Sequence, residues 1–228
     1  MSDHKEIKDV VIIGDGEFAD IAYDYFTNDS DCNIVAFAVE KNFYTKKTFN
    51  DKPVIYVEDL EDNYPSASFM VFVAVTSTKL NRIRRRLYLD CKRKGYKFAS
   101  YVSSNAFFWR NAIIGENTFI FEGNVIQSNV VIGDNCILWS GNHVGHRSVI
   151  KNHVFISSHA VISGYCIIED NCFVGVNSTF ADNVVVKANC VIGAGAIILK
   201  NTEENSIYPA TSTAPSKVKS FQFYKIKE

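Results

Sequence analysis

The sequence has no excess of charge of either sign, no long hydrophobic run near its start and no C-x-x-C pair. Its 24 Lys and Arg residues balance 25 Asp and Glu residues, so there is no bulk positive field to hold a nucleic acid or an anionic membrane. The first apolar run, VVII, is too short for a signal peptide or a membrane span. We therefore expect a cytoplasmic protein with no nucleic-acid partner and no membrane partner.

Cysteine occurs six times. The absence of an export signal argues against disulfides, and the absence of a C-x-x-C pair removes the commonest metal-ligand spacing. An apolar fraction of 47% and a charged fraction of 21% fit a globular protein of one or two domains. Composition alone leaves the role of the cysteines open.

The second half of the chain repeats with a period of six. A helix would require a period near 3.6 and an ordinary strand a period of 2, whereas a long series of period six is typical of a hexapeptide β-helix. The large apolar residues of this axial series are Phe108, Ile114, Ile120, Ile126, Ile132, Leu138, Val144, Ile150, Ile156, Ile162, Ile168, Val174, Phe180, Val186, Ile192 and Ile198.

A second series of small or medium-sized residues lies four positions after the first, from Thr118 to Ala196. We interpret the pattern as a triangular prism of short parallel strands with three hexapeptides per coil, the axial series filling the centre and the second series the corners. Glycines directly after axial residues are expected where a side chain would crowd a corner or where φ is positive. Four cysteines belong to the second series, so we expect them to pack as small hydrophobic residues: Cys136, Cys166, Cys172 and Cys190.

The first hundred residues alternate strand and helix patterns, which predicts a parallel α/β sheet. The expected strands are residues 9–13, 33–39, 68–76 and 97–102, and a basic amphipathic helix is expected at 80–94.

Three regions follow from these patterns. They are an α/β domain with a short, Rossmann-like half-sheet (1–103), a β-helix (104–205) and a C-terminal tail (206–228).

A glycine motif, Gly14-x-Gly16-x-x-Ala19, ends the first strand and opens a helix. Backbone N–H groups in this setting can bind a phosphate, although a plain tight turn has the same sequence. Only one half of a dinucleotide fold is present, which favours a nucleotide sugar or mononucleotide over NAD. Asp15 would repel a pyrophosphate unless it turns away or meets a cation.

Three more polar residues follow strands of the expected sheet. Glu40 lies just after the second strand, where it is either an acceptor for a ribose or base or a solvated carboxylate. Thr76 and Ser77 end the third strand at the sheet edge where α/β proteins bind ligands. Their alternative role is to cap the following helix.

Four of the five histidines lie between His143 and His159. A neutral imidazole can accept a proton near pH 7, so this stretch is the place to look for a general base, with surface histidines as the alternative. His146 comes two positions after an axial residue and is expected at a prism edge. His153 and His159 fall on successive different faces, which argues against a metal site within one chain.

The glycine motif, the short α/β unit and hexapeptides containing WSGNHVGH (139–146) and ISSH (156–159) resemble the PglD/NeuD family of bacterial sugar acyltransferases, over about residues 9–217. The resemblance implies a left-handed β-helix, a homotrimer, acetyl-CoA between neighbouring prisms and no metal. It also implies N-acetylation of a UDP-, dTDP- or GDP-linked amino-deoxy sugar for surface glycans such as lipopolysaccharide O-antigen. The sugar nucleotide would bind at Gly14, Asp15, Gly16, Glu40, Thr76 and Ser77.

The resemblance further assigns catalytic roles. His146 matches the general base, and Gly164 matches the glycine whose N–H receives the thioester carbonyl. The family often has a glutamate directly before the base, where this chain has Gly145, and we expect Asn142 to orient the imidazole instead. CoA is expected to contact Gly164, Gly175, Ala194 and Pro209, although the family's Gly-Val-Pro-Ala ending is replaced by Tyr-Pro-Ala-Thr at 208–211.

Three other functions remain open at this point. The same fold could transfer acetyl to a hydroxyl, as in sialic-acid O-acetyltransferases. A zinc enzyme of the γ-carbonic-anhydrase kind would use His143, His146, His153 or His159 as ligands across subunits. A non-catalytic scaffold would not bind acetyl-CoA saturably.

Overall fold

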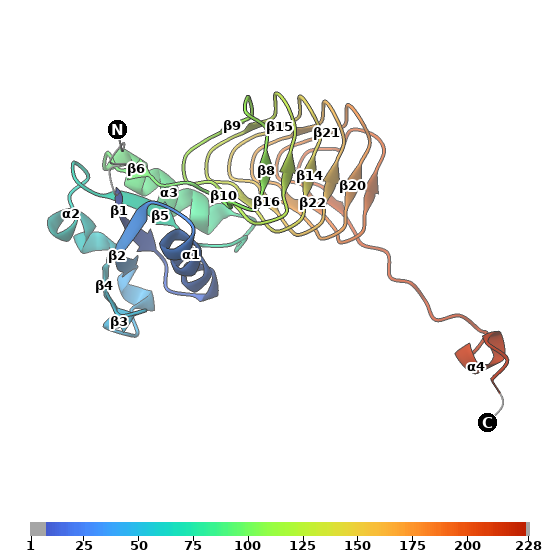
Figure 1. Ribbon diagram of the computed structural model, residues 1–228, viewed down its shortest axis with the longest axis horizontal. Coiled ribbons are helices and arrows are strands. Elements are labelled where there is room, and N and C mark those ends of the chain that lie inside the picture. Colours follow the sequence, from blue (N-terminus) through green and yellow to red (C-terminus); the bar gives the residue numbers. More distant parts are fainter. Residues whose placement is uncertain (1–7, 227–228) are drawn as a thin grey trace.

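The computed structural model describes residues 8–226, which form an α/β domain beside a β-helix, from which a C-terminal segment extends away (Figure 1). None of the helices within residues 8–226 combines the length and the apolar character needed to cross a membrane. The α/β domain contains β1 (Lys8–Ile13), α1 (Glu17–Asn28), β2 (Cys32–Val39), η1 (Lys41–Phe43), β3 (Thr48–Phe49), β4 (Lys52–Tyr56), η2 (Val57–Asp59), α2 (Leu60–Asn63), β5 (Met70–Val73), α3 (Arg82–Arg93) and β6 (Lys97–Phe98).

The sheet of this domain has the order β3-β4-β2-β1-β5-β6 and is parallel except for the β3–β4 hairpin. β1 lies inside the sheet and its residues from Val10 to Ile13 are buried, as expected for a parallel strand covered on both faces. The strands expected at 9–13, 33–39 and 68–76 correspond to β1, β2 and β5, and the helix expected at 80–94 corresponds to α3. The parallel α/β arrangement is confirmed.

The single strand expected at residues 97–102 is two strands that belong to different sheets. β6 pairs with β5 in the α/β domain, whereas β7 (Tyr101–Val102) pairs with β10 in the β-helix. The buried Tyr101 hydroxyl donates a hydrogen bond to Asp29 at the end of α1, which fixes the crossing. The β-helix therefore begins at residue 101, and its last strand, β24, extends to residue 208.

The β-helix is a left-handed triangular prism with one sheet on each face. Face 1 contains β7, β10 (Phe119–Ile120), β13 (Ile137–Leu138), β16 (Phe155–Ile156), β19 (Phe173–Val174), β22 (Val191–Ile192) and β24 (Ile207–Tyr208). Face 2 contains β8 (Phe107–Phe108), β11 (Val125–Ile126), β14 (His143–Val144), β17 (Val161–Ile162), β20 (Thr179–Phe180) and β23 (Ile197–Ile198). Face 3 contains β9 (Ile113–Ile114), β12 (Val131–Ile132), β15 (Val149–Ile150), β18 (Ile167–Ile168) and β21 (Val185–Val186).

The chain passes from face 1 to face 2 to face 3 in every coil, which defines three corners that we call 1–2, 2–3 and 3–1. Residues eighteen apart pair directly, as Ile120 does with Leu138 and Leu138 with Ile156. From Ile120 onward the axial series is buried, and so are the four expected corner cysteines. Burial raises the pKa of the Cys136 thiol to about 12, so the thiol stays protonated and packs as a small hydrophobic group.

Of the two reasons expected for glycines directly after axial residues, crowding is confirmed, whereas the left-handed backbone falls on another position. It occurs three residues after an axial residue, mostly at asparagines such as Asn117 and Asn183, with φ of 52° and 65°. Asparagine tolerates this conformation better than most residues. The glycines directly after axial residues are instead required by space, because a Cβ on Gly145 would lie 2.5 Å from the carbonyl carbon of Ser163.

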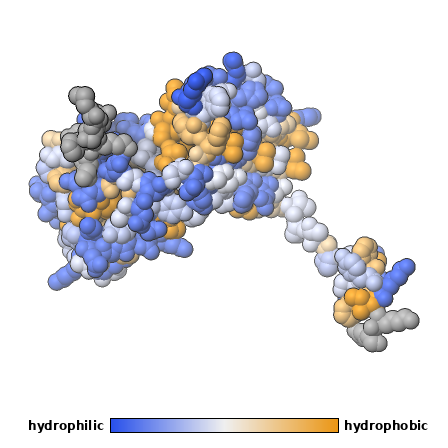
Figure 2. Space-filling model, in the orientation of Figure 1, coloured by the Kyte–Doolittle hydropathy of each residue, from blue (hydrophilic) through white to orange (hydrophobic). Residues whose placement is uncertain are grey.

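The α/β domain covers face 1 of the prism. Outward-facing Phe119 and Phe155 of that face are buried in one hydrophobic cluster with Phe18 and Phe72 of the α/β domain. Faces 2 and 3 instead present exposed apolar residues, and Figure 2 shows hydrophobic residues gathered on the visible side of the prism. Those with the largest exposed fractions on these two faces are Phe107, Ile113 and Ile197.

The C-terminal segment beyond β24 carries one short helix, α4 (Ser220–Phe223), at a distance from the prism (Figure 1).

Candidate functional site

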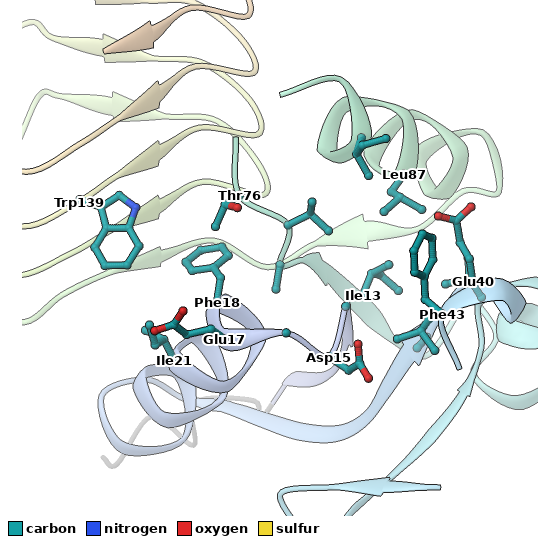
Figure 3. A pocket seen from close by; sticks show the side chains of 18 residues that line it. Ile13, Asp15, Glu17, Phe18, Ile21, Glu40, Phe43, Thr76, Leu87 and Trp139 are labelled. Atoms are coloured by element: carbon teal, nitrogen blue, oxygen red, sulfur yellow. The ribbon is translucent and has the colours of Figure 1, made fainter. Parts of the chain in front are cut away.

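A cavity of about 430 Å³ lies at the carboxyl edge of the α/β sheet, on the side that faces the prism (Figure 3). The ends of β1, β2 and β5, the start of α1 and Trp139 of the prism form its walls. Parallel sheets collect ligands at this edge, since loops and helix N-termini converge there. Five of the six residues expected to bind a sugar nucleotide line the cavity: Gly14, Asp15, Gly16, Glu40 and Thr76.

The glycine turn brings backbone close to this cavity. Gly14 has a φ of 122°, and a Cβ there would lie 2.9 Å from the carbonyl oxygen of Ala74 on β5. Gly16 precedes α1, and a Cβ added to it would meet nothing within 4 Å. There is therefore open space beside Gly16 at the start of α1, which no side chain caps, and an anion placed there would be stabilised by the helix dipole.

Asp15 meets a cation that sequence reasoning missed. The Lys46 ammonium lies 3.5 Å from Oδ2 of Asp15 and donates a hydrogen bond to its carbonyl oxygen at 3.1 Å. The same ammonium lies 3.6 Å from the ring centroid of Phe49. Lys46 sits in a loop with neighbouring lysines at 41 and 47, so no spacing in the sequence singles it out.

Glu40 is also held by a basic side chain. Nη2 of Arg86 on α3 donates to Oε2 of Glu40 at 2.8 Å, and this hydrogen bond is the main cause that raises the pKa of Arg86. A smaller cavity of about 360 Å³ shares Glu40, Val57 and Leu87 with the first and continues past Arg86. Glu40 therefore sits where the two cavities join.

Thr76 and Ser77, which were expected to act together, differ in their position relative to the cavity. The carbonyl oxygen of Thr76 accepts a 2.7 Å hydrogen bond from the buried Arg84, which fixes the loop after β5 against the cavity. Ser77 is not among the residues that line the cavity. Neither side chain caps α3, because that helix is preceded by Asn81 in a left-handed conformation without a side-chain cap.

The second group of expected site residues lies on corner 2–3 of the prism. β14 and β17 pair residue by residue, which stacks His146 and Gly164 one coil apart as the eighteen-residue spacing predicts. A Cβ on Gly164 would lie 2.7 Å from Cε1 and 3.1 Å from Nε2 of His146. The exposed imidazole thus covers Gly164 and meets the ring of Tyr165 edge-on at 5.2 Å.

The N–H of Gly164 already has a partner, which sequence reasoning also missed. It donates to Oδ1 of Asp182, eighteen residues further on, at 2.8 Å. Asp182 is exposed. His146, Gly164 and Asp182 therefore form a column on successive coils, and the same spacing that linked the first two would have found the third.

Asn142 does not orient His146. Its amide nitrogen donates to the carbonyl oxygen of Trp139, and its Oδ1 accepts the N–H of Ala160 at 2.7 Å. The side chain is 1% exposed and belongs to the inward corner series. Both ends of the amide are used inside corner 1–2, and the ring that packs against the imidazole is that of Tyr165.

The residues expected to contact CoA lie on two corners. Three of them lie close together at corner 1–2: Gly175, Ala194 and Pro209. A Cβ on Gly175 would lie 2.7 Å from the backbone nitrogen of Ala194. A Cβ on Gly193, the residue before Ala194, would lie 2.8 Å from the carbonyl carbon of Pro209. Gly164 lies on corner 2–3. One chain therefore does not bring the four residues together.

The other histidines are separated as the sequence predicted. His153 lies on corner 3–1 and is buried, whereas His159 lies on corner 1–2 and is exposed. Across residues 8–226, no three His, Cys, Asp or Glu side chains converge as a metal site would require.

Comparison with known proteins identifies the same architecture elsewhere. A family model described as the GMPPB C-terminal domain matches residues 98–207, which span the prism. No curated protein matches the chain.

Solved structures match nearly the whole chain. The acetyltransferase domain of PglB from Neisseria gonorrhoeae, in complex with acetyl coenzyme A, is 22% identical, with a TM-score of 0.78 over 90% of this chain and 97% of that one. PerB from Caulobacter crescentus, in complex with CoA and GDP-perosamine, is 20% identical, with a TM-score of 0.78 over 90% and 95%. WeeI from Acinetobacter baumannii is 20% identical, with a TM-score of 0.69 over 88% and 93%. The chain shares their fold, an α/β domain followed by a left-handed parallel β-helix.

Proposed function

We propose that this protein is an acetyl-CoA-dependent N-acetyltransferase that acts on the amino group of a nucleotide-linked amino-deoxy sugar. One observation carries the proposal: the chain combines a cavity built on a glycine turn with an imidazole stacked over a glycine on a prism edge. Two proteins of the same fold support it, since the PglB domain is found with acetyl-CoA and PerB with CoA and GDP-perosamine. We place the reaction in the cytoplasm, in the synthesis of a bacterial surface glycan such as the O-antigen of lipopolysaccharide.

The cavity is the proposed site of the sugar nucleotide. Its diphosphate would lie at the start of α1, against the N–H groups that follow Gly16. The carboxylate of Asp15 would repel the diphosphate, but the Lys46 ammonium lies beside this carboxylate and offsets the repulsion. The remaining walls are mainly apolar, as in most small-molecule sites.

The proposed reaction is a direct transfer. The neutral amine attacks the carbonyl carbon of the thioester while His146 takes a proton from the amine, since an imidazole can accept a proton near pH 7. When the C–S bond breaks, the same proton passes to the departing CoA sulfur. The atoms balance without a covalent enzyme intermediate.

Gly164 is the proposed donor to the oxyanion. Its N–H is directed at Asp182 in the structure, so the thioester oxygen must replace that carboxylate when acetyl-CoA binds. Asp182 is exposed and has room to turn into solvent. A preorganised backbone donor of this kind stabilises the tetrahedral intermediate.

A homotrimer would complete the site. The α/β domain covers face 1, so corner 2–3, which carries His146, is the corner opposite the cavity within one chain. The expected CoA residues are likewise divided between corners 1–2 and 2–3. A neighbouring subunit that places its corner 2–3 beside this cavity would unite both halves, and the exposed apolar residues of faces 2 and 3 are suited to such a contact.

The test measures CoA thiol release by the purified protein with acetyl-CoA and a panel of UDP-, dTDP- and GDP-linked amino sugars. We expect saturable release with at least one sugar, a product that contains an alkali-stable amide, and a trimer of 25.6 kDa chains by light scattering. An alkali-labile ester would identify an O-acetyltransferase. Absence of thiol release and of acetyl-CoA binding would favour a scaffold.

A further inference from the structure

The C-terminal segment beyond β24 is separated from the rest of the molecule. It extends away from the prism and carries the short helix α4 (Figure 1), and every residue from 209 to 226 is exposed. Residues 209–216 are small or polar and include two prolines, which suits an extended tether. We call the part that follows the tether, residues 217–226, the basic-aromatic segment.

The basic-aromatic segment presents large apolar side chains to solvent. Its aromatic residues and Ile226 are between 48% and 72% exposed, and Figure 2 shows hydrophobic residues beside hydrophilic ones at this end of the chain. Phe221 and Phe223 are two residues apart in one helical turn, so they point to different sides of it. A groove on a folded protein contacts one side of a segment and is poorly matched to such a turn.

The charge of the segment is opposite in sign to that of the rest of the chain. It contains Lys217, Lys219 and Lys225, and Lys227 follows in the sequence. Four of the 24 basic residues lie after residue 208, but only one of the 25 acidic residues does, so the remainder of the chain is net negative. The balanced charge of the whole sequence, on which the absence of a membrane partner was expected, therefore hides a local positive segment.

Lysines interleaved with aromatic residues fit the surface of an anionic bilayer. Aromatic rings are stabilised at the boundary between headgroups and acyl chains, and this fluid layer contacts an inserted turn on several sides. Each lysine gains from the negative potential of the headgroups. The net negative remainder of the chain has no such gain, and the tether allows it to stay in solution while the segment touches the bilayer.

We propose that the basic-aromatic segment binds the surface of an anionic lipid bilayer, with its aromatic side chains inserted among the headgroups and its lysines paired with lipid phosphates. The contact is peripheral and reversible, since one short anchor of this kind binds only moderately. The proposal depends on the exposed segment alone, and neither outcome of its test bears on the reaction proposed above.

The test is co-sedimentation of the full chain with vesicles of equal parts phosphatidylglycerol and phosphatidylcholine, compared with vesicles of phosphatidylcholine alone. We expect at least roughly tenfold tighter binding to the anionic vesicles, because each lysine near such a surface contributes a factor of about five. High salt should release most of the protein, since it screens the surface potential. Equal binding to both kinds of vesicle, or binding to neither, overturns the proposal.

Substitutions of the lysines test the role of charge. Lys217→Gln, Lys219→Gln and Lys225→Gln together should abolish the preference for anionic vesicles, whereas Arg at the same three positions should keep it. The matched control makes the same change to Gln at three exposed lysines of the prism and its end, which should leave the binding unchanged: Lys151, Lys187 and Lys200. A control that loses as much binding as the segment variant contradicts the role of the segment.

Insertion of the aromatic residues is measured separately. Phe223→Trp adds an indole whose emission should be quenched by anionic vesicles with brominated acyl chains, against an unaltered background from Trp109 and Trp139. Phe221→Ser with Phe223→Ser should weaken binding roughly tenfold or more, without a change in Tm, because both side chains are exposed. Absence of quenching overturns the proposal. A lower Tm or a smaller mass by light scattering for the Ser variant would show that the segment packs on a second copy of the chain, which overturns it as well.

Discussion

The imidazole of His146 lies directly over Gly164, one coil further along the prism, so closely that a Cβ on the glycine would come within 2.7 Å of Cε1. Glycine is thus the only residue that leaves this imidazole in place. The relationship joins a side chain that can accept a proton to a backbone N–H that can stabilise an oxyanion.

Replacement of His146 by Asn should lower kcat by at least roughly a hundredfold, because general-base catalysis commonly contributes that much or more. The KM for acetyl-CoA should change little, since the substitution leaves the backbone of corner 2–3 in place. Steady-state kinetics of thiol release measure both. His159→Asn, the same change on corner 1–2, serves as the control, and equal losses in the two variants would contradict the role of His146.

Two glycine substitutions on the same corner should affect different properties, one the catalytic rate and the other the stability of the fold. Gly164→Ala meets the side chain of His146, which can rotate, so we expect a folded protein with kcat reduced roughly tenfold or more. Gly145→Ala meets the main-chain carbonyl carbon of Ser163 at 2.5 Å, which cannot move without distorting a coil. Thermal melting should therefore show a clear loss of stability for Gly145→Ala and little for Gly164→Ala. The reverse order would refute this reading of the corner.

Protonation of His153 should destabilise the protein in mild acid. Burial, with Arg85 and Arg84 nearby, lowers the pKa of His153 from 6.5 to about 4. Its Nδ1 lies 2.8 Å from Nδ2 of Asn135, so the ring accepts a hydrogen bond there and is neutral. Because the unfolded chain binds the proton first, stability present above pH 6.5 is lost as the pH falls toward 4.

The expected loss in the free energy of unfolding from His153 is about 2 kcal/mol between pH 7 and pH 5. Urea unfolding at the two pH values measures it. His153→Asn keeps a residue suited to the left-handed φ of 61° and removes the titrating group. This variant should show a smaller pH dependence by that amount, and an unchanged slope would exclude His153 as the cause.

Loss of Arg84 should weaken the junction between the two domains. The side chain is fully buried, and its guanidinium donates to main-chain oxygens of Thr76 at 2.7 Å in the α/β domain and of Asn135 at 3.3 Å in the prism. Arg84→Met leaves these buried carbonyl groups without donors. We expect Tm to fall by roughly 5–10 °C in scanning calorimetry. Arg93→Met, an exposed position on the same helix whose guanidinium pairs with Asp90 of that helix, is the control, and an equal change there would contradict the prediction.

Local patterns in the sequence were sufficient for much of the fold. The period of six predicted the prism, its buried axis and the corner cysteines, because each coil repeats the same packing against the next. Eighteen-residue spacing also placed His146 beside Gly164. The glycine motif after the first strand correctly predicted a turn at the edge of the sheet.

Those patterns could not predict the pairings between segments that are distant in the sequence. Asn142 was expected at His146 and lies inside a corner, because its amide is used by the backbone of its own coil and the next. The strand expected at 97–102 divides between two sheets, since β7 pairs with a strand that only the first full coil supplies. The six-residue repeat places Asp182 on the same corner as Gly164. The hydrogen bond between them also requires that the N–H of Gly164 point at the Asp182 carboxylate, and the repeat does not specify that direction.

The sequence by itself determined the architecture and the stacking on each corner, because a repeat encodes the same contact many times over. Only the tertiary structure decided which charges meet in the cavity, where Lys46 joins Asp15 and Arg86 joins Glu40. These pairs are 31 and 46 residues apart and are made once, by a loop and a helix that the sheet and prism bring to the same edge. A contact made once has no periodic signal, so its position depends on packing that no local pattern contains.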